Sequence, residues 1–155
     1  MSDNSKLVSF INTDPDSHFP IQNLPYGIFR TEKNTGSRAC VAISDMVLDL
    51  AVLEDRKLFE NIFSNENEKH IFSGPSLNKF MSLGKEVWHE VRVKLQSLLS
   101  GSDPLLKEDE DLRKECLLPF KNVEMCMPVA IGDYTDFYSS KEHATNVGIM
   151  FRGKE

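Results

Sequence analysis

The stretch Ala39-Cys40-Val41-Ala42-Ile43-Ser44-Asp45-Met46-Val47-Leu48-Asp49-Leu50 decides the fold of the first part of the chain. Two apolar runs, 39–43 and 46–50, lie on either side of the polar pair Ser44-Asp45. This pattern is typical of a β-hairpin, although the turn type stays open because the pair has no glycine. A short apolar run at 27–30, followed by a loop at 34–37, predicts one more strand ahead of the hairpin. The sequence therefore predicts a small sheet.

Helical patterns follow the predicted sheet. Apolar residues with rough helical spacing occupy 52–63, and 65–69 is a polar loop. The longest predicted helix begins at Pro75 or Ser76, runs to about Ser100 and stops at Gly101. Its apolar stripe is typical of core packing. The stripe comprises Leu77, Phe80, Met81, Val87, Trp88, Val91, Leu95, Leu98 and Leu99.

The two flanking regions have weaker patterns. The acidic run at 107–111 favours the dipole of a helix predicted over 112–118, which Pro119 ends. Residues 123–127 alternate weakly as a strand. Residues 1–20 are predicted to be a mobile arm with turn chemistry at 14–17 and a few apolar side chains that tuck onto the domain.

The composition fits one globular domain and excludes some classes of function. The chain has 155 residues, of which 40% are hydrophobic and 27% charged, and its net charge of −6 argues against binding of nucleic acid. No apolar run approaches the roughly 20 residues that cross a bilayer, and 1–5 lacks the features of a signal peptide, so no membrane partner is expected. Cys40, Cys116 and Cys126 have no metal-type spacing and fit free thiols in a reducing, cytoplasmic compartment.

The last stretch, Gly132–Glu155, holds the only cluster of catalytic-type side chains. Carboxylates, phenols, an imidazole and a guanidinium fall close together there, as in polar catalytic sites. Ser139 followed three positions later by Glu142 is a capping-box pattern. It predicts a short helix that begins at Ser140 and ends at Gly148.

Two arrangements of this cluster are open. With the capped helix, His143 lies on the helix, and an extended 133–138 would place Tyr134, Asp136 and Tyr138 on one side. With a helix that begins near 133, Asp136 and His143 would instead share a face. We favour the capped helix. Taken one at a time, Asp136, Tyr138, His143 and Arg152 have ordinary explanations as a turn residue, an interior aromatic, a surface imidazole and a surface charge; their combination favours a site.

The cluster resembles a known family. The runs D-Y-T-D-F-Y-S-S at 133–140, H-A-T-N-V-G at 143–148 and M-F-R-G at 150–153 resemble the start of the catalytic region of the fumarylacetoacetase family. The runs F-P-I-Q-N-L-P-Y-G at 19–27 and N-K-F-M-S-L-G at 78–84 are similar to the family's opening strand and first long helix.

The resemblance implies a fold of the α+β class. Residues 1–20 would be an N-terminal arm, and 21–122 an N-terminal domain built as a small SH3-like β-barrel with added helices. Residues 123–155 would be the truncated start of the family's β-rich catalytic domain.

The resemblance also implies roles for four residues. Asp136 matches a calcium ligand, Tyr138 and Arg152 match substrate-binding groups, and His143 matches the general base that activates water. The chemistry suits each role, because Ca²⁺ (and Mg²⁺, the second implied metal) takes oxygen ligands, imidazole changes charge near neutral pH, and a guanidinium fits a carboxylate.

The implied function is hydrolysis of the carbon–carbon bond of 4-fumarylacetoacetate to fumarate and acetoacetate in tyrosine and phenylalanine breakdown, by a homodimer. The family's other metal carboxylates and oxyanion donors lie beyond the region that this chain matches, so the 155-residue chain is expected to be an inactive fragment. Two alternatives stay open: a related keto-acid hydrolase or decarboxylase, and a non-catalytic interaction or dimer-modifying fragment.

Overall fold

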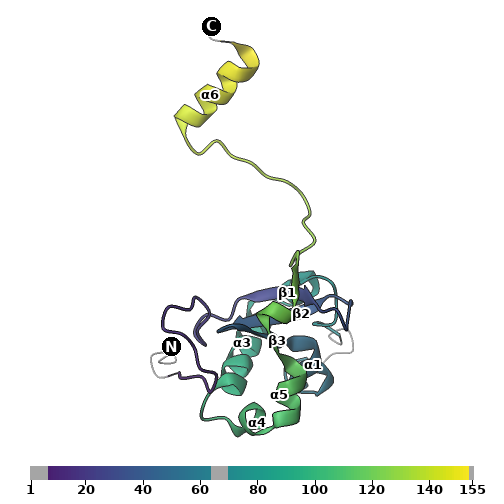
Figure 1. Cartoon of the computed structure of the whole chain (residues 1–155). Helices are drawn as coiled ribbons and strands as arrows, with labels where there is room; N and C mark the ends of the chain where they lie inside the picture. The colour runs from purple at the N-terminus through teal and green to yellow at the C-terminus, as the bar shows by residue number, and fades with distance from the viewer. Residues whose placement is uncertain (1–6, 64–69, 154–155) are drawn as a thin grey trace.

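The chain has a mixed α and β fold around one antiparallel sheet (Figure 1). The computed structural model describes residues 7–63 and 70–153. Five strands lie in the order β4-β3-β2-β1-β5, and each pairs with its neighbour antiparallel. Their bounds are β1 Tyr26–Arg30, β2 Arg38–Ile43, β3 Met46–Asp49, β4 Leu117–Pro119 and β5 Glu124–Cys126.

The predicted hairpin is confirmed. β2 and β3 pair from Cys40↔Asp49 to Ile43↔Met46, with Ser44 and Asp45 as the turn. Ser44 takes a positive φ of 55°, so this turn reaches the left-handed region without a glycine. The N–H of Ser44 donates to Phe19 O at 2.8 Å, which holds the turn against the N-terminal arm.

The described part of the arm, residues 7–20, is held against the body. Its apolar residues Leu7, Phe10 and Ile11 pack against the core, as predicted. In addition, the Phe10 N–H donates to Leu99 O at 3.1 Å and the Gly101 N–H donates to Val8 O at 2.8 Å. The prediction of a mobile arm did not include these backbone hydrogen bonds. The predicted turn at 14–17 is confirmed by the Ser17 N–H, which donates to Asp14 O at 2.9 Å.

The prediction of one helix from residue 75 to residue 100 is wrong. The structure has two helices, α2 Asn78–Met81 and α3 Lys85–Leu99. The break lies at 82–84: Ser82 is the C-cap of α2, and Gly84, whose φ of 87° favours glycine, is the N-cap of α3. Across it, Trp88 Nε1 donates to Phe80 O at 2.9 Å. Most of the predicted stripe is buried or partly buried, but Met81 and Trp88 are exposed, which corrects their assignment to the core.

Three short helices complete the body: α1 Leu50–Asp55, α4 Pro104–Glu108 and α5 Glu110–Cys116. The predicted helix over 112–118 is therefore displaced, because Leu117 and Leu118 leave it to pair with β3 as strand β4. The helical pattern over 52–63 is helical only as far as Asp55, and the predicted loop at 65–69 lies outside the described residues.

A buried ion pair joins α1 to the sheet. Asp49 caps α1 by accepting the N–H groups of Ala51 at 3.0 Å and Val52 at 3.3 Å. Its other oxygen accepts Arg38 Nε at 2.6 Å, and the two side chains are only 1% and 12% exposed. The Arg38 guanidinium also lies 4.3 Å from the centre of the Phe29 ring. Burial raises the pKa of Asp49, and the hydrogen bond from Arg38 opposes that rise.

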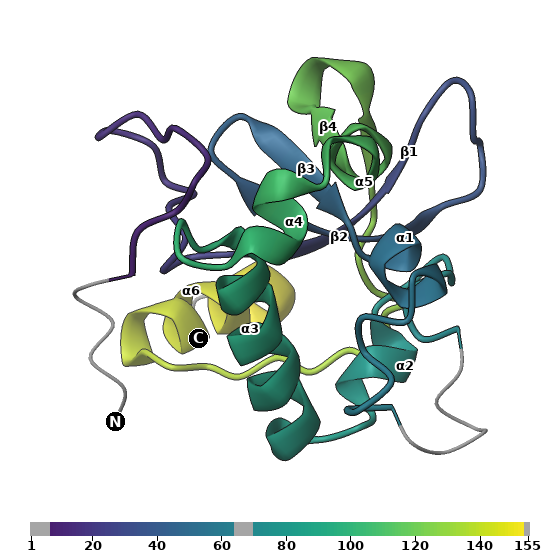
Figure 2. The same ribbon diagram turned by 90° about the horizontal axis from the view of Figure 1, so that it is seen from below.

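The sheet is covered on both faces. The helices α1, α3, α4 and α5 lie on one side of it, as the view from below shows (Figure 2), and enclose the main core with Ile28, Val41 and Leu48. A smaller cluster on the other face joins Phe29, Cys40 and Val47, covered by Leu118, Phe120 and Val123. Because both faces are buried, β2 reads as a continuous apolar run and not as an alternating one.

The chain leaves the body after β5. This strand pairs with β1 at Ile28↔Cys126, which confirms the strand predicted over 123–127. The predicted boundary between 122 and 123 precedes β5, and the division into two domains stays a prediction. Residues 131–139 have no regular structure, and α6 Lys141–Arg152 stands apart from the rest of the described chain (Figure 1). None of the helices in 7–63 and 70–153 is both long enough and apolar enough to cross a membrane.

Candidate functional site

The four predicted site residues lie on the segment that stands apart from the body. Asp136 and Tyr138 belong to the irregular stretch before α6, and His143 and Arg152 lie on α6. All four side chains are exposed.

Helix α6 confirms the capped arrangement but corrects both of its ends. The cap is Ser140, whose Oγ accepts the His143 N–H at 3.1 Å, so the predicted cap at Ser139 is one residue early. The helix passes through Gly148 and ends at Gly153, where φ is 84°. A glycine inside a helix costs only about 1 kcal/mol, so Gly148 alone does not stop it. The alternative helix from 133 is absent from the described residues, since 133–138 is not helical.

Three of the predicted residues come close together. The rings of Tyr138 and His143 lie 5.5 Å apart between their centres and are tilted by 50°. Tyr138 and Arg152 also line one hollow of about 340 Å³, together with the small residues Ala144 and Gly148. The segment therefore places the Tyr138 phenol next to the His143 imidazole. Arg152 lines the same hollow as Tyr138.

Asp136 is not linked to these three residues by a hydrogen bond or an ion pair in the described part of the chain. Within the described part of the chain it makes no hydrogen bond or ion pair, and no three His, Cys, Asp or Glu side chains there are grouped so that they could hold a metal ion. Calcium takes roughly six to eight oxygen ligands, and one carboxylate supplies at most two. The described residues do not by themselves fit a calcium site.

Large apolar side chains on the same segment are exposed, a feature that the sequence reading missed. Tyr134 is 86% exposed, Phe137 80% and Phe151 82%, and Ile131 and Met150 are exposed to a similar extent. Single exposed apolar residues are common, but a set of this size within about 20 residues is typical of a surface that takes part in binding.

The start of the segment is fixed by a residue that the sequence reading also missed. Asn78 Nδ2 donates to Ala130 O at 2.9 Å, and the Ala130 N–H donates to Asn78 Oδ1 at 2.8 Å. The two residues are 52 positions apart, so no local pattern predicts the contact.

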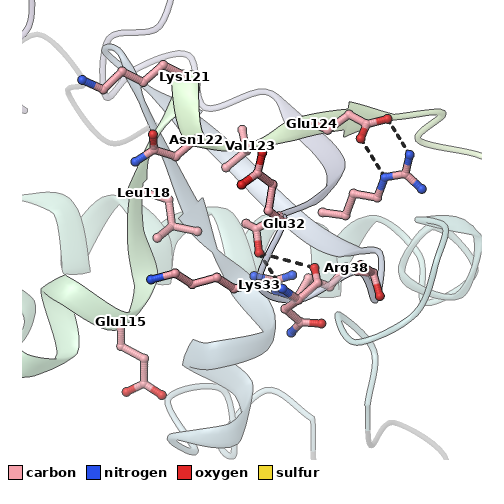
Figure 3. Close-up of a pocket in the computed structure, with 13 residues that line it drawn as sticks. Glu32, Lys33, Arg38, Glu115, Leu118, Lys121, Asn122, Val123 and Glu124 are labelled. Atoms are coloured by element: carbon pink, nitrogen blue, oxygen red, sulfur yellow. Dashed lines mark hydrogen bonds and ion pairs between the residues drawn. The ribbon is translucent and has the colours of Figure 1, made fainter.

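A second hollow, of about 1000 Å³, is lined by the end of β1, the loop that follows it and residues between 115 and 124 (Figure 3). Charged side chains of both signs surround it, including Glu32, Lys33 and Lys121. Its other charges are already paired: Glu124 accepts both Nε and Nη2 of Arg30, and Glu115 pairs with Arg56, while Arg38 pairs with Asp49. With its charges largely neutralised and no nucleophile beside a base, this hollow is a weaker candidate than the segment.

The two buried cysteines offer no nucleophile either. Burial raises the pKa of Cys40 and of Cys116 to about 12, so both thiols stay protonated at neutral pH. All three cysteines are free.

Comparison with known proteins gives a consistent result. The family model described as "Fumarylacetoacetase N-terminal" matches residues 22–128. The chain is 52% identical over 151 residues to "Fumarylacetoacetase" from Dictyostelium discoideum, 50% over 148 residues to that from Mus musculus, and 49% over 148 residues to that from Homo sapiens. These matches cover 96–97% of this chain but only 35% of each relative. The chain thus spans about a third of the length of these relatives.

Proposed function

Since the chain belongs to the fumarylacetoacetase N-terminal family, we propose that it forms the N-terminal part of a fumarylacetoacetase. That enzyme hydrolyses the carbon–carbon bond of 4-fumarylacetoacetate to fumarate and acetoacetate, in tyrosine and phenylalanine breakdown. The observation that carries the proposal is the identity of about 50% to proteins of that name over nearly the whole of this chain.

The segment after Ala130 supplies part of the catalytic machinery in this proposal. His143 acts as the general base: it takes a proton from water, and the oxygen then adds to the ketone carbon. The bond from that carbon to the acetoacetate part then breaks, and the departing enolate takes up a proton, which balances the proton that His143 removed. Tyr138 and Arg152 hold the substrate, with the guanidinium on a carboxylate. The contact between the Tyr138 and His143 rings and the hollow shared by Tyr138 and Arg152 support this grouping.

The 155-residue chain alone is expected to be inactive, because its candidate groups are exposed to water and its described residues lack a metal site. The test compares this chain with the product of the complete reading frame, each incubated with fumarylacetoacetate, and quantifies fumarate. We expect fumarate from the complete product only. If the complete product forms no fumarate, the proposed function is wrong. If the 155-residue chain forms fumarate, the proposal that its site is incomplete is wrong.

We also propose that Ca²⁺, with Mg²⁺ as a second metal, binds to the complete protein through Asp136 and oxygen ligands outside the described residues. A calcium titration of the complete protein tests this, with Asp136→Asn as the variant. An unchanged affinity in the variant would remove Asp136 from the ligand set.

The remaining expectations are proposals about the whole protein. We propose that the whole protein is a homodimer. We propose a cytoplasmic location, with which the free cysteines are consistent. We also propose that the sheet forms an SH3-like barrel, with which its five short antiparallel strands are consistent. The pairing of β5 with β1 supports a domain boundary a few residues after the predicted one.

A second candidate function is non-catalytic. The bare aromatic side chains at 134, 137 and 151 favour association with another polypeptide, such as a complete subunit of the enzyme. Light scattering of the 155-residue chain, alone and mixed with the complete protein, tests this. A monomer that does not associate would exclude it.

A further inference from the structure

The segment with the candidate catalytic residues is tied to the body at one point. The Asn78 amide makes two hydrogen bonds to the backbone of Ala130, one as donor and one as acceptor. Beside it, the Leu77 N–H donates to Pro128 O at 2.8 Å. Three hydrogen bonds therefore hold residues 128–130 against the start of α2.

The chemistry of this contact requires an amide. A side-chain amide carries a carbonyl acceptor and an NH₂ donor side by side, so it can satisfy both polar groups of one backbone residue as a neighbouring strand would. An aspartate lacks the donor, and an alanine lacks both groups. Asn78 thus binds the backbone of the chain at Ala130, four residues after the end of β5, where no strand pairs with it.

The body behind Asn78 is well packed. Phe80 of α2 is buried, and its ring lies 5.1 Å from the Tyr26 ring and 5.2 Å from the Phe72 ring. The Trp88 indole donates to Phe80 O and joins α2 to α3. Asn78 therefore lies on a well-packed helix, whereas residues 131–139, which follow Ala130, are exposed and irregular.

From this placement we propose that Asn78 is a positioning residue for the reaction, which fixes where and in which direction the His143 segment leaves the N-terminal body. The inference rests on the proposed function. A slip of one residue at Ala130 moves an extended chain by about 3.3 Å. Misplacement of catalytic groups by about 1 Å can lower a rate about a hundredfold.

The first experiment uses the product of the complete reading frame. Asn78→Ala should lower kcat about tenfold or more and should also raise KM, because Tyr138, His143 and Arg152 lie on the same segment and are displaced together. Asn23→Ala is the matched control: its amide also donates to a backbone oxygen, that of His18 at 2.8 Å, and this bond does not involve residues 128–130. The control should keep its kcat even where its thermal midpoint falls as far as that of Asn78→Ala.

The second experiment needs no activity. Amide hydrogen exchange in the 155-residue chain should be at least about tenfold faster at Ala130 in Asn78→Ala than in the unchanged chain. The amide of Ile28, in β1, should keep its protection in both, which shows that the sheet is intact.

The outcomes separate the two proposals. If the complete product has no hydrolase activity, the proposed function fails, and the exchange at Ala130 alone decides whether Asn78 holds the exit. If the product is active, a kcat of Asn78→Ala within about twofold of the unchanged protein overturns the positioning role. Equal losses of kcat in Asn78→Ala and Asn23→Ala at equal folded fraction would also overturn it.

Discussion

Removal of the Asp49 carboxylate should be among the most destabilising single changes in this chain. In Asp49→Ala, the N–H groups of Ala51 and Val52 lose their cap, and the Arg38 guanidinium loses the partner that lies 2.6 Å from its Nε. Arg38 cannot move to water without disturbing its contact with the Phe29 ring, since its side chain is only 12% exposed.

The magnitude follows from these contacts. Loss of a helix cap costs about 1 kcal/mol. Removal of one partner from a buried ion pair costs about 3–5 kcal/mol, mainly because the other charge stays buried without a partner. The two terms share one carboxylate and overlap, so we expect a total of about 4 kcal/mol, a large part of the stability of a domain of this size.

Urea unfolding followed by circular dichroism at pH 7 measures this effect. With a slope of about 2 kcal/mol per molar urea, the midpoint should fall by about 2 M. The control is Glu124→Ala, which removes the exposed ion pair with Arg30 and should shift the midpoint little. An Asp49→Ala midpoint no lower than that of Glu124→Ala would refute the reasoning.

Three further predictions concern other buried groups and α6. Tyr26→Phe should leave the free energy of unfolding unchanged or raise it by about 1 kcal/mol, because the buried hydroxyl has no hydrogen-bond partner in the described chain; a clear loss in urea unfolding would reveal a partner. Burial raises the pKa of Tyr26, Cys40 and Cys116 to about 12 each, so the unfolded chain releases these protons first, and stability should fall as the pH rises from about 9 towards 12; equal urea midpoints at pH 8 and pH 10.5 would contradict this. Gly148→Ala should favour the helical state of α6 by about 1 kcal/mol, since an added Cβ meets no atom within 4 Å; unchanged carbon-13 α shifts across α6 would contradict it.

Local patterns predicted the elements that depend on local chemistry. The β2–β3 hairpin follows from two apolar runs around Ser44-Asp45, and the position of His143 on a helix follows from a serine cap nearby. The cap was displaced by one residue because Ser139 and Ser140 are chemically equivalent candidates, and only the backbone conformation distinguishes them.

Elements that depend on distant partners were not predictable from the sequence. Leu117 and Leu118 suit a helix or a strand, and the open edge of β3 decides between them. The apolar stripe continues through Gly84, so periodicity gives no sign of the break there. The two hydrogen bonds between Asn78 and Ala130 join residues that are 52 positions apart, and neither residue has a distinctive local pattern.

The break at Gly84 gives the chain a built-in optical probe. The protein has one tryptophan, and its half-exposed indole donates to a carbonyl of the helix on the other side of the break. Indole emission responds to the loss of such a bond and to contact with water. Native fluorescence therefore shows, without an attached label, whether α2 keeps its position next to residues 128–130 when substrate or another subunit binds.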